Sequence, residues 1–205
     1  MSPSHQQQPS KVSKFDPTAP LTSLSADSCP FCAIASTFSP YDPSSPPPSS
    51  SPQLNPENLS PSTYIVLSTP TLLAFLDIMP LSPGHLLLCP RSHRPKLTDV
   101  TGHEAADLGA HLRLLSRALC RTTGVQDWNV VQNNGAAAAQ VVNHVHYHLI
   151  PRPEIRASGR FSESFTMFGR GVRSDLDDDE AAAMAERIRK ELKGVLDEEA
   201  TRGKL

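Results

Sequence analysis

The run H-V-H-Y-H-L-I, residues 144–150, constrains the fold of this chain more strongly than any other feature. Polar and apolar residues alternate in it with a period of two, which is the spacing of a β-strand whose two faces meet different surroundings. Pro151 follows and ends the strand, because proline cannot donate to a sheet. The pattern therefore predicts a strand with His144, His146 and His148 on one face, about 6–7 Å apart from one to the next.

Three imidazoles on one strand face indicate a functional site. A single histidine would be an ordinary strand residue, but histidine is not a favoured strand filler, and three on one face repel one another whenever two are protonated. Two kinds of chemistry fit the pattern. One is a metal site built from imidazoles. The other is nucleophilic and acid–base catalysis at phosphorus, for which an imidazole that is neutral near pH 7 is suited.

The remaining apolar stretches predict an antiparallel sheet with helices. Turn residues bound each stretch, including a proline-rich turn at 80–84 and N-N-G at 133–135. The predicted strands cover residues 64–67, 71–77, 85–89, 128–132 and 144–150. A short helix is expected within 29–38. The fold class is α+β: a five-stranded antiparallel sheet with a long helix across one face and a C-terminal helix.

The long helix is predicted over residues 101–122. Thr101 and Glu104 have the spacing of a capping box, leucines repeat at helical spacing after them, and Gly124 is a C-terminal stop. A second helix is expected over about 177–198, where acidic residues crowd the start and basic residues follow, as the helix dipole prefers. Its apolar stripe is narrow, and the sequence does not decide whether it packs on its own sheet or on a partner subunit.

The distribution of proline and serine along the 205 residues predicts which segments fold and which do not. Twenty prolines are more than a compact domain of this size needs. Residues 1–26 are expected to form a disordered tail, 27–153 a domain interrupted by a Ser/Pro-rich surface loop at 39–62, and 154–205 a C-terminal extension.

Charge and hydropathy exclude several classes of partner. A net charge of −2 gives no electrostatic argument for nucleic acid or a membrane surface, and no apolar stretch is long enough to span a bilayer. The N-terminus lacks the apolar core of a secretory signal. The expected location is the cytoplasm, with the nucleus as a second possibility. Cys89 and Cys120 are expected to be inert core residues, whereas the C-P-F-C spacing of Cys29 and Cys32 is that of a zinc half-site, which alone is a weak signal.

The histidine run resembles the H-φ-H-φ-H-φ-φ signature of the histidine-triad (HIT) superfamily, in which φ is an apolar residue. Further motifs occur in the family's order between Cys29 and Pro153: C-P-F-C at 29, A-F-L-D-I at 74, P-G-H-L at 83, C-P-R-S-H at 89 and Q-N-N-G at 132. Within the superfamily, the A-F-L-D-I and Q-N-N-G motifs are most similar to the Hint-like nucleoside phosphoramidases, in particular the fungal members.

The resemblance implies a hydrolase that cleaves a P–N or P–O bond at the α-phosphate of a purine nucleotide and releases AMP. His146 would be the nucleophile that forms a nucleotidyl-histidine intermediate. His148 would contact the phosphate, His85 would orient the cluster, and His144 would complete the triad. The family also implies a homodimer.

The resemblance also implies a set of nucleotide contacts. Asp77 would accept hydrogen bonds from the ribose hydroxyls, and Asn133 would lie near the scissile phosphate. Gln140 and the backbone amides around it would face the phosphate. Four apolar side chains would surround the base: Phe31, Ile34, Phe75 and Ile78. Many relatives have glycine before this glutamine and serine or threonine after it, whereas this chain has Ala139 and Val141, so its substrate preference or rate is expected to differ.

In relatives that bind zinc, the ligands correspond to Cys29, Cys32, His93 and His144, which would form a closed, tetrahedral structural site. The alternative is two small buried thiols without a metal.

Two other functions are compatible with the sequence. One is hydrolysis of dinucleoside polyphosphates, as in the fragile-histidine-triad branch, which differs from this chain at Asp77 and Asn133. The other is a nucleotide-binding interaction protein with little catalysis, for which the valine at position 141 and the Ser/Pro-rich loop are the main support. A DNA-end-processing enzyme is less favoured, because no basic patch follows the triad.

Overall fold

The computed structural model of the protein describes residues 28–153, 173 and 175–202. The disordered tail expected at 1–26 lies outside these residues, as do positions 154–172, 174 and 203–205 of the C-terminal extension. None of the helices in the described part of the chain is both long and apolar enough to cross a membrane.

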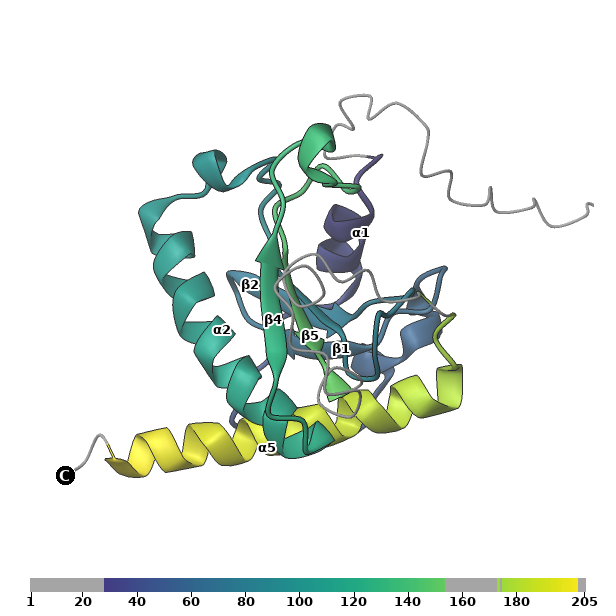
Figure 1. The fold of residues 1–205 in the computed structure, drawn as a ribbon. Coiled ribbons are helices and arrows are strands. Elements are labelled where there is room, and N and C mark those ends of the chain that lie inside the picture. Colours follow the sequence, from purple (N-terminus) through teal and green to yellow (C-terminus); the bar gives the residue numbers. More distant parts are fainter. Residues whose placement is uncertain (1–27, 154–172, 174, 203–205) are drawn as a thin grey trace, which may run out of the picture.

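The described residues contain one five-stranded sheet in which all neighbouring strands are antiparallel (Figure 1). The strand order is β1-β2-β3-β5-β4, so β1 and β4 are the edges. The strands are β1 (Ile65–Ser68), β2 (Leu72–Leu76), β3 (Leu86–Pro90), β4 (Trp128–Gln132) and β5 (Tyr147–Pro151). The predicted α+β fold class is confirmed.

The last strand is shorter than the histidine alternation predicts. It begins at Tyr147, so only His148 of the three histidines lies in it. Tyr147 pairs with Leu88, and continuing this register would place Val145 opposite Pro90, which has no amide hydrogen to donate. The Val145 amide donates instead to the carbonyl of Arg94 at 2.6 Å. The residues before Tyr147 therefore form a loop that the hydrogen bond to Arg94 fixes beside the sheet.

The long helix α2 (Gly102–Thr123) forms where local signals predict it. The Thr101 side chain accepts a hydrogen bond from the amide of Glu104, and the Glu104 carboxylate accepts one from the amide of Thr101, which completes the capping box. At the other end, Gly124 has a φ of 70°, the left-handed conformation that ends helices and that glycine adopts without strain.

The C-terminal helix α5 (Asp178–Arg202) packs on its own sheet and against α2 (Figure 1). Its apolar stripe is buried in one core with the leucines of α2 and one face of the sheet, which settles the question that the sequence left open. The buried residues of the stripe are Ala181, Ala185, Ile188, Leu192 and Val195. Arg113, Arg117 and Arg121 of α2 form ion pairs with Glu198 and Glu199 of α5.

The opposite face of the sheet carries the short helix α1 (Pro30–Thr37) and a second apolar core. Arg91 ties the helix to the sheet: its guanidinium donates to the carbonyl of Ala35 at 2.6 Å, to the carbonyl of Phe38 and to the Ser68 hydroxyl. Cys89 is fully buried in this core, as predicted, whereas Cys120 on α2 is only partly buried.

The Ser/Pro-rich segment 39–62 is held against the protein rather than extended throughout. It contains two short 3-10 helices, Pro52–Leu54 and Pro56–Asn58. Each starts with proline after a side-chain cap, Ser51 or Asn55, a local signal that the low-complexity composition concealed. Arg189 of α5 also holds the segment, donating to the Ser49 hydroxyl at 2.9 Å.

Candidate active site

The histidine cluster lies on the face of the sheet that carries α1. His148 pairs across the sheet with Leu87, which belongs to the α1-side core. The His146 and His148 rings are neighbours, with centroids 4.9 Å apart, and the His85 ring lies 5.1 Å from that of His148. The structure thus brings together three of the four predicted catalytic histidines, and the ring of the fourth, His144, turns toward the cysteines.

The protonated nitrogen of His85 and of His148 is set by a chain of hydrogen bonds. The Leu81 amide donates to His85 Nδ1 at 3.1 Å, so a neutral His85 ring carries its hydrogen on Nε2. That Nε2 lies 2.9 Å from His148 Nδ1, which must therefore accept. A neutral His148 then carries its own hydrogen on Nε2, where it is available as a donor to an anion.

The opposite tautomer is set at His146. Its Nδ1 lies 2.7 Å from the carbonyl oxygen of His144, and a carbonyl can only accept, so Nδ1 carries the hydrogen. In the neutral ring, Nε2 of His146 is then a free lone pair, with no hydrogen-bond partner among the residues that the structure describes. The site therefore places a bare imidazole nitrogen beside an imidazole N–H donor.

Burial keeps these rings neutral at physiological pH. Desolvation lowers the pKa of His85 to about 4 and that of His148 to about 3, and it also lowers the pKa of His146. Neighbouring positive charges, including Arg173, lower the pKa of His85 and His148 further. Neutral imidazoles are the form required for a nucleophile and for the tautomers assigned above.

Asp77 is buried at the end of β2, directly beside the histidines. Its Oδ1 accepts a hydrogen bond from the Met79 amide at 2.8 Å. Its Oδ2 lies 3.5 Å from His85 Nδ1 and 3.9 Å from His148 Nδ1. One oxygen of the predicted ribose-binding carboxylate is thus held by the backbone, and the other faces the cluster.

Three of the four apolar residues predicted around the base are buried in the α1-side core, namely Phe31, Ile34 and Phe75. The Phe31 and His146 rings pack in a T-shaped arrangement, with centroids 5.2 Å apart and planes at 87°. Ile78 differs, because 47% of its surface is exposed. Phe31 therefore joins the apolar core to the nucleophile candidate, and Ile78 lies at the rim.

The buried side chain of Gln140 stabilises the loop that follows β4. The side chain of Gln140 is buried, accepts from the Gly135 amide at 2.6 Å and donates to the Pro95 carbonyl at 2.7 Å. The Gln140 side chain thus holds the loop internally and ties it to Pro95, whereas the resemblance implied that Gln140 would face the phosphate. Asn133 is half-exposed, and its side chain donates to the Ala139 carbonyl at 3.4 Å.

The two positions that depart from the family pattern lie in this loop. Ala139 has a φ of 61°, a left-handed conformation that costs about 1 kcal/mol for a residue with a Cβ and favours glycine, the residue that the resemblance leads us to expect there. The amides of Ala139 and Gln140 donate to carbonyls inside the loop. Val141 is exposed and, among the described residues, its amide has no such partner, so it is the one of the three amides available to an anion.

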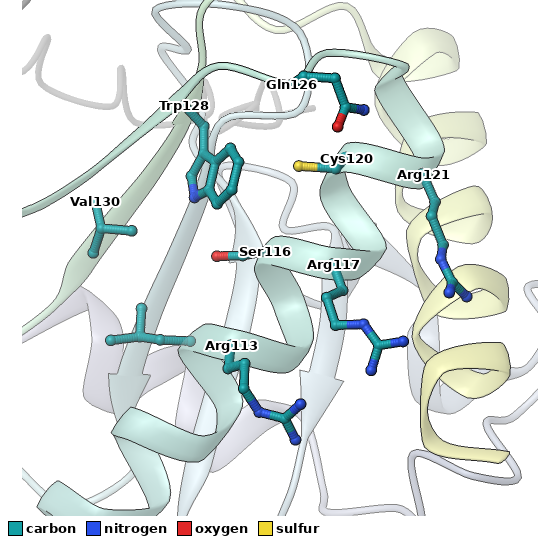
Figure 2. A pocket seen from close by; sticks show the side chains of 9 residues that line it. Arg113, Ser116, Arg117, Cys120, Arg121, Gln126, Trp128 and Val130 are labelled. Carbon is teal, nitrogen blue, oxygen red and sulfur yellow. The ribbon is translucent and has the colours of Figure 1, made fainter. Parts of the chain in front are cut away.

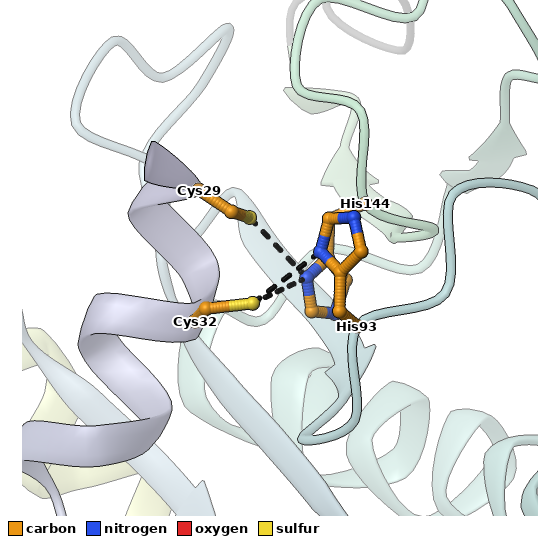
Figure 3. A group of neighbouring side chains, drawn as sticks. All are labelled: Cys29, Cys32, His93 and His144. Carbon is orange, nitrogen blue, oxygen red and sulfur yellow. Dashed lines mark hydrogen bonds between the residues drawn. The ribbon is translucent and has the colours of Figure 1, made fainter. Parts of the chain in front are cut away.

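The predicted metal ligands come together in one cluster (Figure 3). Cys29 Sγ lies 3.4 Å and Cys32 Sγ 3.7 Å from His144 Nδ1, and Cys32 Sγ lies 3.3 Å from His93 Nδ1. A tetrahedral zinc with bonds of about 2.3 Å to sulfur and about 2.0–2.1 Å to nitrogen would place neighbouring ligand atoms about 3.5 Å apart. His144 Nε2 donates to the Pro90 carbonyl at 2.9 Å, so its bare Nδ1 faces the thiols. The cluster can hold a metal ion.

A second group, formed by Asp77, His85 and His148, is equally compact but suits a metal less well. The Leu81 amide occupies His85 Nδ1, and the hydrogen on Nε2 occupies the other ring nitrogen. Arg173 already pairs with the carboxylate at 3.2 Å. The donor atoms of this group are therefore engaged with one another and with a cation.

Several residues at the site carried no signal in the sequence analysis. Leu81 acts through its backbone amide, which every residue except proline supplies, so no motif marks it. Pro90 lies within the C-P-R-S-H motif, but it acts through its carbonyl, a role that the motif does not indicate. Arg94 contributes its carbonyl to the Val145 amide, and its side chain pairs with Glu104 at 3.0 Å. Arg173 reaches Asp77 across 96 positions of sequence.

The chain is similar in sequence to proteins that contain a HIT domain. The model of the HIT domain matches residues 59–155. The adenosine 5'-monophosphoramidase of Schizosaccharomyces pombe is 42% identical over 81 residues, which are 40% of this chain and 58% of that protein. An uncharacterized HIT-like protein of Methanocaldococcus jannaschii is 37% identical over 90 residues, covering 44% of this chain and 69% of that one.

Among solved structures, a Zn-bound histidine triad family protein from Mycobacterium smegmatis superposes with a TM-score of 0.57 at 25% identity, covering 83% of this chain and 97% of that one. The fold, the motifs and these matches show that the chain belongs to the histidine-triad family. The matches span about half the length of several curated relatives, between 42% and 63%.

Proposed function

We propose that this protein is an AMP-releasing nucleotide hydrolase of the adenosine 5'-monophosphoramidase type. The observation that carries the proposal is the opposed tautomer pair: a bare Nε2 on His146 beside an Nε2–H on His148. The name of the S. pombe relative supports the same activity. The predicted nucleotide contacts around this pair support a nucleotide as the substrate.

The reaction follows from the two tautomers. His146 Nε2 attacks the α-phosphorus, a P–Nε2 bond forms, the bond to the amine breaks, and the amine departs with a proton taken from solvent water. The His148 Nε2–H donates to a phosphate oxygen as charge develops on it. Water then attacks phosphorus and gives up a proton to solvent, the P–Nε2 bond breaks, and AMP leaves with His146 neutral again.

We propose that the Cys/His cluster holds a structural zinc ion. Cys29, Cys32, His93 and His144 would supply the four ligands, and the ion itself would take no part in the reaction. Its effect would reach the nucleophile through one residue, because the carbonyl of His144 fixes the hydrogen of His146 on Nδ1. The Zn-bound histidine triad family protein of M. smegmatis, which has the same fold, supports this assignment.

The experiment that tests the proposed reaction compares AMP release from adenosine 5'-phosphoramidate by the wild type and by His146→Ala. The proposal requires that the wild type releases AMP and that the variant loses the activity by several orders of magnitude. AMP release at the wild-type rate by His146→Ala would overturn it. Turnover of a diadenosine polyphosphate in parallel tests the alternative hydrolase, and AMP binding without turnover of either substrate would favour a nucleotide-binding interaction protein.

We also propose that two copies of the chain associate through β4 and α2. On the outer edge of the sheet, 39% of Trp128 and 45% of Val130 are exposed, and an apolar groove separates them from α2 (Figure 2). A bare apolar edge strand favours pairing with another strand, and antiparallel pairing of β4 with a second β4 obeys a two-fold axis. The homodimer that the family resemblance implies supports a second copy of this chain as the partner.

Sedimentation analysis tests the dimer directly. The wild type should sediment with twice the mass of one chain, and Val130→Arg should sediment as a monomer because the arginine places a charge in the interface. Leu97→Arg is the matched control, since Leu97 is 40% exposed and does not line the groove. A monomeric wild type would contradict the proposal.

A further inference from the structure

Arg173 belongs to the C-terminal extension, yet its guanidinium contacts the proposed ribose site. Its Nη1 donates to Oδ2 of Asp77 at 3.2 Å and to the carbonyl oxygen of Met79. Both partners lie just after β2, within the segment predicted to bind the nucleoside. The extension therefore supplies a cation to the carboxylate that is predicted to bind the ribose.

The oxygen that Arg173 contacts is the one a nucleotide would use. Oδ1 of Asp77 is held by the Met79 amide, which leaves Oδ2 to face the histidines. A ribose diol binds a carboxylate by donating to its oxygens. The ribose hydroxyls would therefore approach the same oxygen that Arg173 contacts.

The main chain near Arg173 is anchored by contacts that do not involve its side chain. The Leu176 amide donates to the Ile78 carbonyl at 3.3 Å, and the Tyr64 hydroxyl donates to Asp178 at 2.7 Å. Ala181 follows one turn later and is buried in the main core. Replacing the Arg173 side chain should therefore leave the extension in place.

We propose that Arg173 is an intramolecular competitor for Asp77, displaced by the ribose when a nucleotide binds, an inference that rests on the proposed function. The two side chains differ in burial: 8% of the Asp77 side chain is exposed, against 43% for Arg173. The Met79 amide donates only to Oδ1, and a buried carboxylate oxygen without a donor is costly, so Arg173 compensates Oδ2 of Asp77 in the nucleotide-free protein. A half-exposed arginine returns to water at little cost, so a diol with two donors can replace it. The competition lowers the apparent affinity for the nucleotide.

Titration calorimetry with AMP on the full chain tests this competition. Arg173→Gln should bind AMP about two- to five-fold more tightly than the wild type, the range expected for losing a weak ion pair in competition. Arg187→Gln is the matched control, because Arg187 is an exposed arginine of α5 that contacts Met184 and not the site. In an Asp77→Asn background, Arg173→Gln should give no further gain, because the charged partner is gone.

The outcomes separate this inference from the proposed function. Weaker AMP binding by Arg173→Gln would overturn the competition and make Arg173 a ligand of the nucleotide. Unchanged affinity, with a thermal unfolding midpoint equal to that of the wild type, would also overturn it. Absence of AMP binding by both the wild type and Arg173→Gln would overturn the nucleotide function itself.

Discussion

The buried side chain of His85 should make the free energy of unfolding fall as the pH is lowered from 7 to 5. His85 has a pKa of about 4 in the folded protein, against 6.5 in an exposed histidine. The unfolded chain therefore binds a proton in this interval that the folded protein does not. The stability associated with a neutral His85 is complete above pH 6.5 and is lost as the pH falls toward 4.

The size of the effect follows from these two values. Each pH unit between them costs about 1.4 kcal/mol for one proton, so His85 should contribute a loss of about 2 kcal/mol between pH 7 and pH 5. Burial is the main cause of the shift, and the side chain of His85 is fully buried, so solvent screening does not reduce this figure.

Urea denaturation at pH 7 and pH 5 measures the effect, with His85→Gln as the variant. Glutamine does not titrate, and its amide can still donate to His148, so the variant should lose about 2 kcal/mol less than the wild type over this interval. His103→Gln is the control, because the His103 side chain is 77% exposed on α2, and it should follow the wild type. Equal pH dependence of His85→Gln and the wild type would refute the assignment of His85 as a buried neutral imidazole.

Three further changes test other parts of the structure. Glu104→Ala removes the capping box and the partner of Arg94, so the free energy of unfolding should fall by about 2 kcal/mol, measured by urea denaturation. Cys32→Ser should lower the zinc content of the purified protein, measured by atomic emission, because one of four ligands is lost. Val141→Ser introduces the hydroxyl that the resemblance implies at this position and should raise phosphoramidate turnover about five-fold, as expected for one added hydrogen bond.

Each of these changes has a matched control. Glu186→Ala removes an exposed carboxylate from α5 and should leave stability unchanged, so an equal loss in both variants would contradict the role of the cap. Cys120→Ser changes a cysteine outside the metal cluster and should retain the zinc. Val141→Ala separates the added hydroxyl from the loss of the isopropyl group, and equal rates for the serine and alanine variants would argue against the hydroxyl.

The fold was predictable where its signals are local. Thr101, Glu104 and Gly124 set the ends of α2 through contacts within a few residues, and the sequence shows those residues side by side. The start of β5 could not be predicted, because it depends on Pro90, which lies far away in sequence and on the neighbouring strand β3. Alternation reveals which residues suit a strand, but a missing hydrogen-bond donor on the neighbouring strand decides where pairing begins.

The candidate site also has features that the sequence predicted and features that it could not predict. The family resemblance predicted the catalytic histidines and the four residues of the Cys/His cluster. The structure brings His85, His146 and His148 together and places His144 with Cys29, Cys32 and His93. It also assigns the tautomers, which depend on the Leu81 amide and the His144 carbonyl and cannot be predicted from side-chain identity. Arg173 could not be predicted either, because a single arginine in a segment without periodicity has no pattern that points to Asp77.

The central claim is that His146 Nε2 attacks the α-phosphorus. Rapid quenching of the wild type with adenosine 5'-phosphoramidate, followed by mass spectrometry of the peptides, tests it most directly. The claim predicts one nucleotidyl group per modified chain, attached to His146, and no such adduct on His146→Ala. An adduct on another histidine, or AMP release by His146→Ala at the wild-type rate, would contradict it.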